Sequence, residues 1–297
     1  MFRPIMARRG LRCAFAAAFV AVASTAIAQS SASSTSVEQQ PAPPAPAPPP
    51  RITVTSGLDA TSSYMFRGIY QEDRGLVAPA FLDVRIPLYR GQGRVSAVRA
   101  NLGTWDSFHS GPTGAEGHDS AWYEADYYAS VTATLGRWSP GVVTTAITSP
   151  NAAFGTVYEV GASLDFDDSG NRVPLAPRVF FVAELSGQAD AGATPGRYLE
   201  VSMRPTRTLR RSGRATWGVA FPARAGFSVR GYYESPESTT LGFASAGLLP
   251  SVTITGARVA LELHAGLELM RLGASASVFN SGRHHRPIVT AGASLTY

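Results

Sequence analysis

Apolar and polar residues alternate along most of the chain beyond residue 50, and this alternation predicts extended strands. In the stretch 123–135, Tyr127 and Val131 fall on one face while Glu124 and Asp126 fall on the other, because successive side chains of a strand point to opposite sides. The same alternation recurs at 52–66, 80–88, 158–166, 179–185, 199–204, 215–221, 227–234, 253–269 and 287–297. No segment repeats every 3.6 residues, so we expect an all-β protein.

Several of these alternating segments are long enough to cross a lipid bilayer, which takes about 9–11 residues of tilted strand. Turn-forming residues separate them at 90–93, 139–141, 149–151 and 167–171, and longer polar connections lie at 106–120, 188–196 and 235–250. A direct count gives roughly thirteen strands, but a single-chain bacterial barrel has an even number. We therefore predict an antiparallel transmembrane β-barrel of about twelve strands, within a range of about ten to fourteen. The odd count means either that one of the counted segments is not a strand or that the stretch 253–269 contains two strands.

The charged residues of these strands fall on the polar faces, and the apolar faces carry almost no charge. A water-soluble barrel would have its charged face outside, whereas a membrane barrel has it in the lumen. Strand length and predicted export favour the second arrangement. The predicted pore-lining residues are Asp59, Arg67, Asp83, Arg85, Arg99, Glu124, Asp126, Glu159, Arg178, Glu184, Glu200, Arg204, Arg230 and Glu262. Acidic residues outnumber basic ones on this face, which favours weak cation preference.

The first 50 residues have a different composition and predict two segments ahead of the barrel. Four arginines, a short apolar run and the small-residue triplet at 26–28 have the pattern of a cleaved secretory signal, which we assign to residues 1–28. Residues 29–50 are rich in Ser and Thr and then in Pro and Ala, which predicts an extended periplasmic linker. The barrel then spans residues 51–297. Cys13 lies inside the predicted signal, so no disulfide is expected afterwards.

Charge and composition exclude several classes of function. The formal charge of +5 falls to +1 once the four arginines of the predicted signal are removed, leaving 22 basic and 21 acidic residues. Such a balance does not favour nucleic-acid binding. The sequence contains no lysine, which excludes Schiff-base chemistry and the lysine of phosphate-binding loops. We expect no cofactor and no metal, since the histidines lack carboxylate partners at metal-binding spacing.

The stretch Pro287–Tyr297 is an amphipathic strand that ends on an aromatic residue. It looks like the C-terminal strand of bacterial outer-membrane barrels, in which the final aromatic residue is read by the assembly machinery. We therefore expect Tyr297 to be an assembly signal and the protein to reside in the cell outer membrane. The expected partners are the barrel assembly machinery, membrane lipid and lipopolysaccharide. Nine aromatic residues near predicted strand ends are candidates for the interfacial girdles: Tyr64, Phe66, Trp105, Tyr123, Trp138, Tyr158, Trp217, Tyr233 and Tyr297.

The segment SSYMFRGIYQ, Ser62 to Gln71, followed by the strand AFLDVRIPLY, resembles the TorF-type porin family of outer-membrane proteins. Ser62, Tyr64, Phe66, Arg67 and Gly68 match its Ser-x-Tyr-x-Phe-Arg-Gly element. The resemblance implies an outer-membrane barrel with a channel role, and it supplies no catalytic residues.

Two readings of Arg67 remain open: it ends a strand beside a glycine turn, or it pairs with lumen carboxylates or lipopolysaccharide phosphates. The leading functional hypothesis is a non-enzymatic channel for small polar solutes, with the connection 106–120 folding inward. The alternatives are a non-conducting surface or adhesive barrel and a lipid-modifying enzyme. The enzyme hypothesis would draw on His264, Glu262 and either Ser275 or Ser277, but no nucleophile-elbow motif surrounds either serine.

Overall fold

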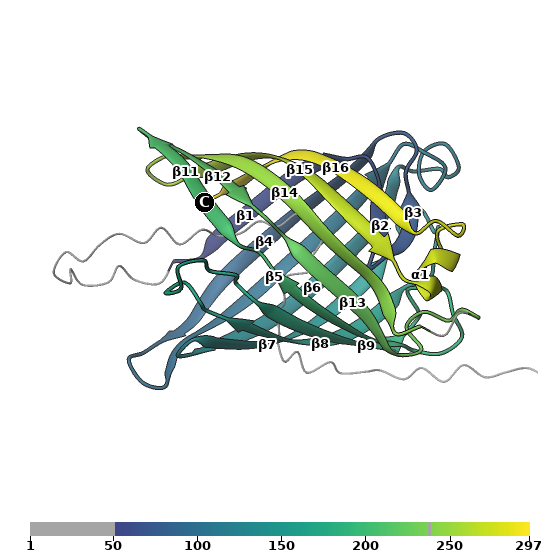
Figure 1. Cartoon of the computed structure of the whole chain (residues 1–297), viewed down its shortest axis with the longest axis horizontal. Coiled ribbons are helices and arrows are strands. Elements are labelled where there is room, and N and C mark those ends of the chain that lie inside the picture. The colour runs from purple at the N-terminus through teal and green to yellow at the C-terminus, as the bar shows by residue number, and fades with distance from the viewer. Residues whose placement is uncertain (1–50, 237–238) are drawn as a thin grey trace, which may run out of the picture.

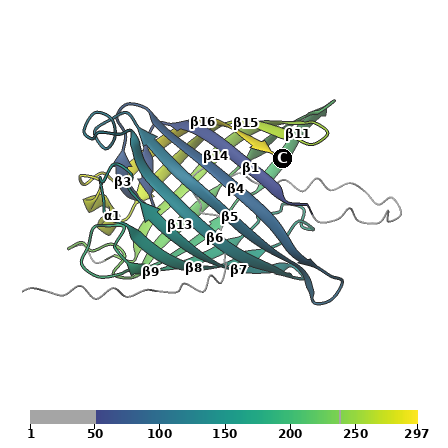
Figure 2. The same cartoon turned by 180° about the vertical axis from the view of Figure 1, so that it is seen from behind.

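A computed structural model describes residues 51–236 and 239–297 of the 297-residue chain. One antiparallel sheet of fourteen strands closes on itself as a barrel of twelve, confirming the predicted fold class and strand number. Figures 1 and 2 show the strands tilted around a common axis. The predicted signal peptide, residues 1–28, and the predicted linker, residues 29–50, lie outside the described residues.

The wall consists of antiparallel strands, and most of them pair with the wall strands that come before and after them in the sequence. The uninterrupted wall strands are β1 (Thr53–Thr61), β4 (Val77–Arg90), β5 (Val95–His109), β6 (Trp122–Leu135), β7 (Trp138–Thr148), β8 (Val157–Phe166), β9 (Arg178–Ser186), β14 (Leu241–Thr255), β15 (Ala260–Leu272) and β16 (His285–Thr296). The barrel closes where β1 pairs with β16, with Thr55 opposite Thr296 and Thr61 opposite Thr290.

Two further wall strands are interrupted by proline. β10 (Arg197–Met203) is followed beyond Pro205 by β11 (Thr206–Ser212), and β12 (Ala215–Ala220) is followed beyond Pro222 by β13 (Ala223–Arg230). Proline has no N–H group to give to the ladder, so each ladder breaks there. The first part of β14 pairs with β13 and the second part with β12. The β11–β12 hairpin therefore projects at the end of the barrel that holds the C-terminus (Figure 1).

Three boundaries differ from the sequence prediction. The turn expected at 139–141 lies within β7, and the chain turns instead at Gly136, whose φ is 61°. The connection expected at 235–250 is too long, because β14 begins at Leu241 and its many small residues look like loop composition. The stretch 253–269 contains two strands, since β14 and β15 meet at a turn in which the N–H of Gly256 donates to the carbonyl of Val259.

The first predicted strand, 52–66, also ends early. β1 stops at Thr61, and the next residues leave the wall as a separate two-stranded sheet of β2 (Tyr64–Phe66) and β3 (Ile69–Glu72). The wall does not need this hairpin, because β1 pairs directly with β4 from Thr53 opposite Arg85 to Thr61 opposite Val77. The short helix α1 (Ala274–Val278) lies at the same end of the barrel as β2 and β3 (Figure 1). Among the described residues, no helix is both long and apolar enough to cross a membrane.

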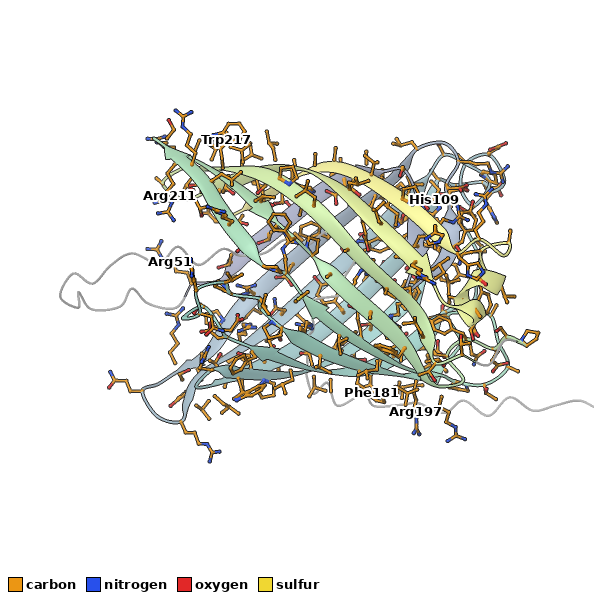
Figure 3. All side chains as sticks on the ribbon, in the orientation of Figure 1. Arg51, His109, Phe181, Arg197, Arg211 and Trp217 are labelled. Atoms are coloured by element: carbon orange, nitrogen blue, oxygen red, sulfur yellow. The ribbon has the colours of Figure 1, made fainter. Side chains whose placement is uncertain are left out.

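The two faces of the wall have opposite chemistry. Leucine, valine and tyrosine side chains point outward along the strands, as at Leu58, Leu82, Tyr127 and Leu263, and remain accessible. The alternate positions carry charged side chains that are buried inside the barrel; Glu124, for example, is only 3% exposed. Figure 3 shows side chains on both sides of the ribbon. The polar face therefore points inward.

Gly292 of β16 is a close-packed position in this wall. It lies opposite both Asp59 of β1 and His264 of β15, whose carboxylate and imidazole approach to 3.1 Å. A Cβ atom at position 292 would collide with the Asp59 carboxylate.

We expect Gly292→Ala to destabilise the barrel by about 1–3 kcal/mol, the usual cost of overpacking. Gly155→Ala is the matched control, because a Cβ atom there meets nothing within 4 Å. The temperature at which the folded barrel loses its compact gel mobility measures the difference. Equal midpoints for the two variants would show that Gly292 is not needed for the Asp59–His264 contact.

Candidate functional site

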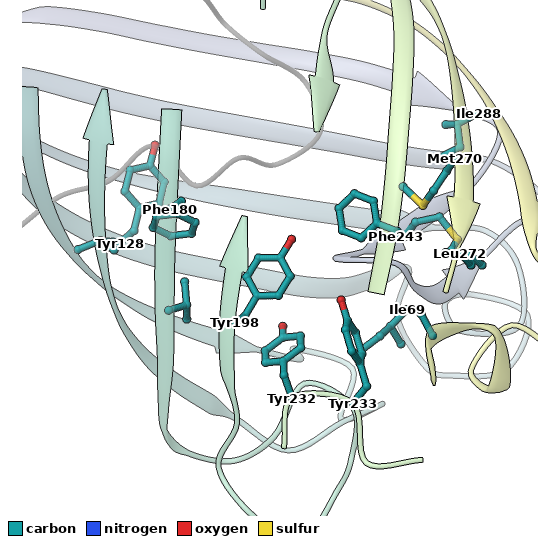
Figure 4. Packing of buried hydrophobic residues seen from close by; sticks show 14 residues of the cluster. Ile69, Tyr128, Phe180, Tyr198, Tyr232, Tyr233, Phe243, Met270, Leu272 and Ile288 are labelled. Atoms are coloured by element: carbon teal, nitrogen blue, oxygen red, sulfur yellow. The ribbon is translucent and has the colours of Figure 1, made fainter. Parts of the chain in front are cut away.

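The β2–β3 hairpin folds into the lumen at one end of the barrel. Its apolar side chains Met65 and Ile69 are buried and belong to a cluster that lines the inside of that end. Figure 4 shows Ile69 beside Tyr233, with Tyr198, Tyr232 and Phe243 gathered inside the wall. The cluster consists of Met65, Ile69, Tyr128, Val143, Phe180, Val182, Tyr198, Tyr232, Tyr233, Phe243, Met270, Leu272, Ala276 and Ile288.

Arg67 lies at the tip of this hairpin. Its Nη1 and Nη2 atoms donate to the two oxygens of Glu159 on β8, at 2.6 and 2.8 Å, and Nη1 also donates to the hydroxyl of Tyr232 at 2.8 Å. Two parallel N–H···O bonds between a guanidinium and a carboxylate form a strong, directional pair. The structure shows both features that the sequence left open for Arg67: it follows the end of β2 beside a glycine turn, and it pairs with a carboxylate of the wall.

Aromatic rings surround the same guanidinium. Its central carbon lies 4.7 Å from the ring centroid of Phe66, 5.0 Å from that of Tyr198 and 5.6 Å from that of Tyr232. A cation within about 6 Å of an aromatic face is attracted by the ring's quadrupole. The guanidinium of Arg67 is therefore enclosed by aromatic rings and by the carboxylate of Glu159. We call the three wall residues Glu159, Tyr198 and Tyr232 the box.

The backbone of the tip is held as well. Arg67 has a left-handed φ of 49°, and Gly68 follows with a φ of 86°. The hydroxyl of Tyr233 donates to the carbonyl of Arg67 at 2.7 Å, and the side-chain amide of Asn280 donates to the carbonyl of Gly68 at 2.8 Å. Sequence reasoning did not find Tyr233 or Asn280 as contacts of the tip, because both are far from it along the chain.

Further carboxylates are buried in the wall around the tip. Glu124, Asp126 and Glu184 lie within electrostatic reach of Arg67. Glu124 accepts a hydrogen bond from the hydroxyl of Tyr64 at 2.9 Å, while Oδ1 of Asp126 is buried without a hydrogen-bond partner among the described residues. The wall around the tip is therefore rich in buried carboxyl groups, of which Glu159 is the one that pairs with the guanidinium.

The other end of the hairpin is tied to the loop 110–121 by Glu72. One of its oxygens accepts the backbone N–H of Asp73 and of Arg74, and the other accepts the N–H and the hydroxyl of Thr113, all at 2.9 to 3.0 Å. Part of the connection expected to fold inward, 106–120, belongs to the wall, because β5 continues to His109. The loop that follows contacts the hairpin through Thr113 and Glu72.

A buried hydrogen-bonded chain continues from this anchor. The hydroxyl of Thr113 bonds Nδ1 of His109 at 2.6 Å, and Nε2 of the same ring bonds the hydroxyl of Ser107 at 2.8 Å. Ser107 and His109 are both fully buried, and the imidazole stacks on Tyr123. A serine and a histidine this close have the elements of a nucleophile and a base, but their burial leaves no room for a substrate. The chain fixes the loop.

The serine–histidine arrangement considered from the sequence is not assembled. His264 is paired with Asp59, whereas Ser275 in α1 bonds Thr239 in the loop before β14. His109 and Ser107 are the nearest equivalent, and the sequence signal for them was only a serine two residues before a histidine.

The remaining predicted pore-lining residues are distributed along the wall. Arg178 pairs with Asp165 at 2.8 Å, and Asp83 accepts hydrogen bonds from Asn101 and Tyr128. Four of them are partly buried, namely Arg85, Arg99, Arg204 and Glu262, and three are buried, namely Asp59, Glu184 and Glu200.

Arg230 is an exception, because its side chain is exposed at the last position of β13. One lumen pair was absent from the predicted set: Arg224 donates to Glu268 at 2.8 Å.

The expected aromatic girdle is only partly correct. Trp138, Tyr158, Trp217 and Tyr297 are accessible on the outside. The other predicted members point inward and are mostly buried: Tyr64, Phe66, Trp105, Tyr123 and Tyr233. Strand ends alone do not reveal the face, because the segment 62–76 leaves the wall and the loop residue Tyr233 contacts it.

Two carboxyl groups at the base of the hairpin, Glu72 and Asp73, have lowered pKa values, which favours their ionised forms. Burial by itself would raise the pKa of Glu72, but the hydrogen bonds from Thr113, Arg74 and Asp73 outweigh it and lower that pKa. Burial likewise opposes the lowered pKa of Asp73, which is held down by hydrogen bonds from Tyr70 and Arg286. No group of residues suited to hold a metal ion occurs in the described part of the chain.

We expect acid to loosen the anchor of the hairpin. A carboxyl group with a lowered folded-state pKa contributes stability that is complete above its unfolded pKa, about 4.3 for glutamate, and is lost as the pH falls through the folded value. Limited proteolysis of the loop 110–121 should therefore accelerate below about pH 4 in the wild type. Glu72→Gln should show fast cleavage already at pH 7, whereas Glu116→Gln, an exposed residue of the same loop, should not. A pH-independent cleavage rate in the wild type would contradict this assignment.

Comparison with known proteins gives likeness in architecture. No protein-family model matches the chain, and no curated protein matches it. Among solved structures, a bacterial polysaccharide outer membrane secretin aligns with a TM-score of 0.46 and 10% identity over 83% of this chain and 97% of that chain. The NanC porin aligns with a TM-score of 0.43 and 8% identity over 83% and 99%, and LpxR from Salmonella typhimurium with 0.38 and 10% over 81% and 99%. TM-scores below 0.5 say nothing of this chain's activity.

Proposed function

We propose that this chain is an outer-membrane channel for small polar solutes, closed at its outer end by the β2–β3 hairpin. The observation that carries the proposal is the independence of the wall from its plug. β1 pairs with β4 directly, and β2 pairs only with β3, so the hairpin can leave the lumen while every wall ladder stays intact. A passage that is closed by a detachable element, and lined by charge, suits regulated diffusion better than catalysis.

Residence in a membrane is supported by the outer face. Leu58, Leu102, Tyr127, Leu263 and Val289 are all accessible on the strands. A water-soluble monomer rarely exposes so continuous an apolar surface. Lipid covers such a face at no cost, and a closed barrel leaves no strand edge unpaired within the bilayer.

The expected sidedness follows from the lengths of the connections. The C-terminus and Arg51 lie at the end of the barrel opposite the hairpin (Figures 1 and 3). Bacterial barrels have short periplasmic turns and longer outer loops. We accordingly assign the hairpin end to the outside, where lipopolysaccharide is the surrounding lipid, and Tyr297 to the periplasmic end as the residue that assembly machinery would read.

A non-conducting barrel is the second candidate, and one observation favours it. Met65, Tyr198 and Tyr232 are all fully buried where the hairpin meets the wall. Packing this tight resembles the filled interior of small barrels. Surface structure or adhesion would then be the role of the loops.

Conductance of the refolded protein in planar bilayers decides between the two. We expect rare, small openings in the wild type and frequent openings with weak cation preference in R67A/E159Q, because the double variant removes the tip contact without leaving an unpaired buried charge. Arg230→Ala, which removes an exposed arginine, should behave as the wild type. A well-folded double variant that conducts no ions would contradict the channel function.

The membrane-facing assignment predicts a second result. Leu263→Arg places a charge on the accessible face of β15, three residues after the strand begins, and it should weaken folding into lipid vesicles by about 1–2 kcal/mol, between the costs at the midplane and at the interface. Thr253→Arg, on the opposite face, is the matched control and should cost much less. The urea dependence of folding into vesicles measures both. An equal cost for the two variants would show that the accessible face does not meet lipid.

A further inference from the structure

The box around Arg67 has the composition of a binding site for a planar cation. Its floor is the carboxylate of Glu159, which takes two parallel hydrogen bonds, and its sides include the rings of Tyr198 and Tyr232. These three residues come from β8, from β10 and from the loop after β13, none of them part of the hairpin. The residues that surround the guanidinium therefore come mainly from the wall and its loop, and the guanidinium itself comes from the hairpin.

Several buried carboxyl groups surround the box. Glu159 is 3% exposed, and the carboxylates of Glu124, Asp126 and Glu184 are buried nearby. Oδ1 of Asp126 has no hydrogen-bond partner among the described residues. If the hairpin leaves, Glu159 remains as a buried charge without its partner, which is strongly unfavourable unless another cation replaces the guanidinium.

We propose that the Glu159–Tyr198–Tyr232 box is a binding site for solutes with a guanidinium group, and that Arg67 is its built-in ligand. A solute of the same chemistry competes with Arg67 for the box and releases the hairpin, so the permeating solute itself opens the passage. This inference rests on the proposed channel function for passage, but the binding step stands without it. Guanidinium is favoured over a simple ammonium because the carboxylate is engaged by two parallel donors and the rings face a flat cation.

Free arginine and citrulline are matched probes. They have the same length, but the side-chain end of citrulline is an uncharged urea group. Titration calorimetry would be carried out on the refolded full barrel in detergent micelles, with R67A, whose box is vacated, and with R67A/E159Q, whose floor is neutral. Circular dichroism and heat-modifiable gel mobility establish that each variant is folded, and Arg67→Gln replaces R67A should the latter fail to refold.

We expect R67A to bind arginine about 10- to 100-fold more tightly than citrulline, the range expected for hydrogen bonds to a charged group. The preference should disappear in R67A/E159Q. R67A that binds arginine and citrulline equally, or whose preference survives the Glu159→Gln change, would overturn the proposal.

The wild type offers a second measurement that needs no variant. Chymotrypsin cleaves after aromatic residues, and Tyr64 and Phe66 are shielded while the hairpin is inserted. Millimolar arginine, but not citrulline, should accelerate cleavage at these two positions, while cleavage elsewhere stays unchanged. Cleavage at the same rate with both probes would contradict competition at the box.

Failure of this inference and failure of the channel function are separable. Arginine-specific binding to a barrel that never conducts would support the binding site and contradict the channel function. Conductance that increases equally with arginine and citrulline would support the channel function and contradict the binding site.

Discussion

Closure of the sheet is the constraint on which the rest of the structure depends. A strand at the edge of an open sheet exposes unpaired N–H and C=O groups, which lipid cannot satisfy. Here the pairing of β1 with β16 completes the ring. β14 pairs with β12 and β13, the two halves of one proline-interrupted strand, and these halves pair in turn with β11 and β10. Once the ring is closed, one face of every strand must point inward.

The inward face then has to be filled or solvated. Side chains on this face form pairs across the wall: Arg178 pairs with Asp165, Arg224 pairs with Glu268, and the imidazole of His264 contacts Asp59. At the end of the barrel that holds the hairpin, the buried carboxylate of Glu159 points inward, and Arg67 pairs with it from outside the wall ladder. Met65 and Ile69 pack against the aromatic cluster at the same end.

The combination of a fixed wall and a separate plug is what makes a channel function coherent. The plug is fastened at its tip by Arg67 and at its base by Glu72, and each fastening is electrostatic. Apolar packing alone would hold a hairpin without regard to solutes or pH. If the chain works as the proposed channel, fastening by charge makes the hairpin sensitive to cations that compete with Arg67 and to acid that protonates Glu72.

The sequence by itself determined the wall. Alternation of side chains is local, so the fold class, the inward charged face and the approximate strand number could all be predicted from neighbouring residues. Its errors at 139–141 and 235–250 came from proline and small residues, whose composition is the same in a turn and in a strand that packs closely against its neighbours. A matching pattern at Tyr64 and Phe66 likewise suggested that the first strand continued.

Only the tertiary structure decided what fills the lumen. Arg67 meets Glu159 from 92 positions away, Tyr232 from 165, and Asn280 meets Gly68 from 212. Pairing at such separations depends on strand register and on the diameter of the closed barrel, neither of which is recorded in any short stretch of residues. The sequence could place Arg67 beside a glycine turn, but only closure of the barrel brings the carboxylate and the aromatic rings to the guanidinium.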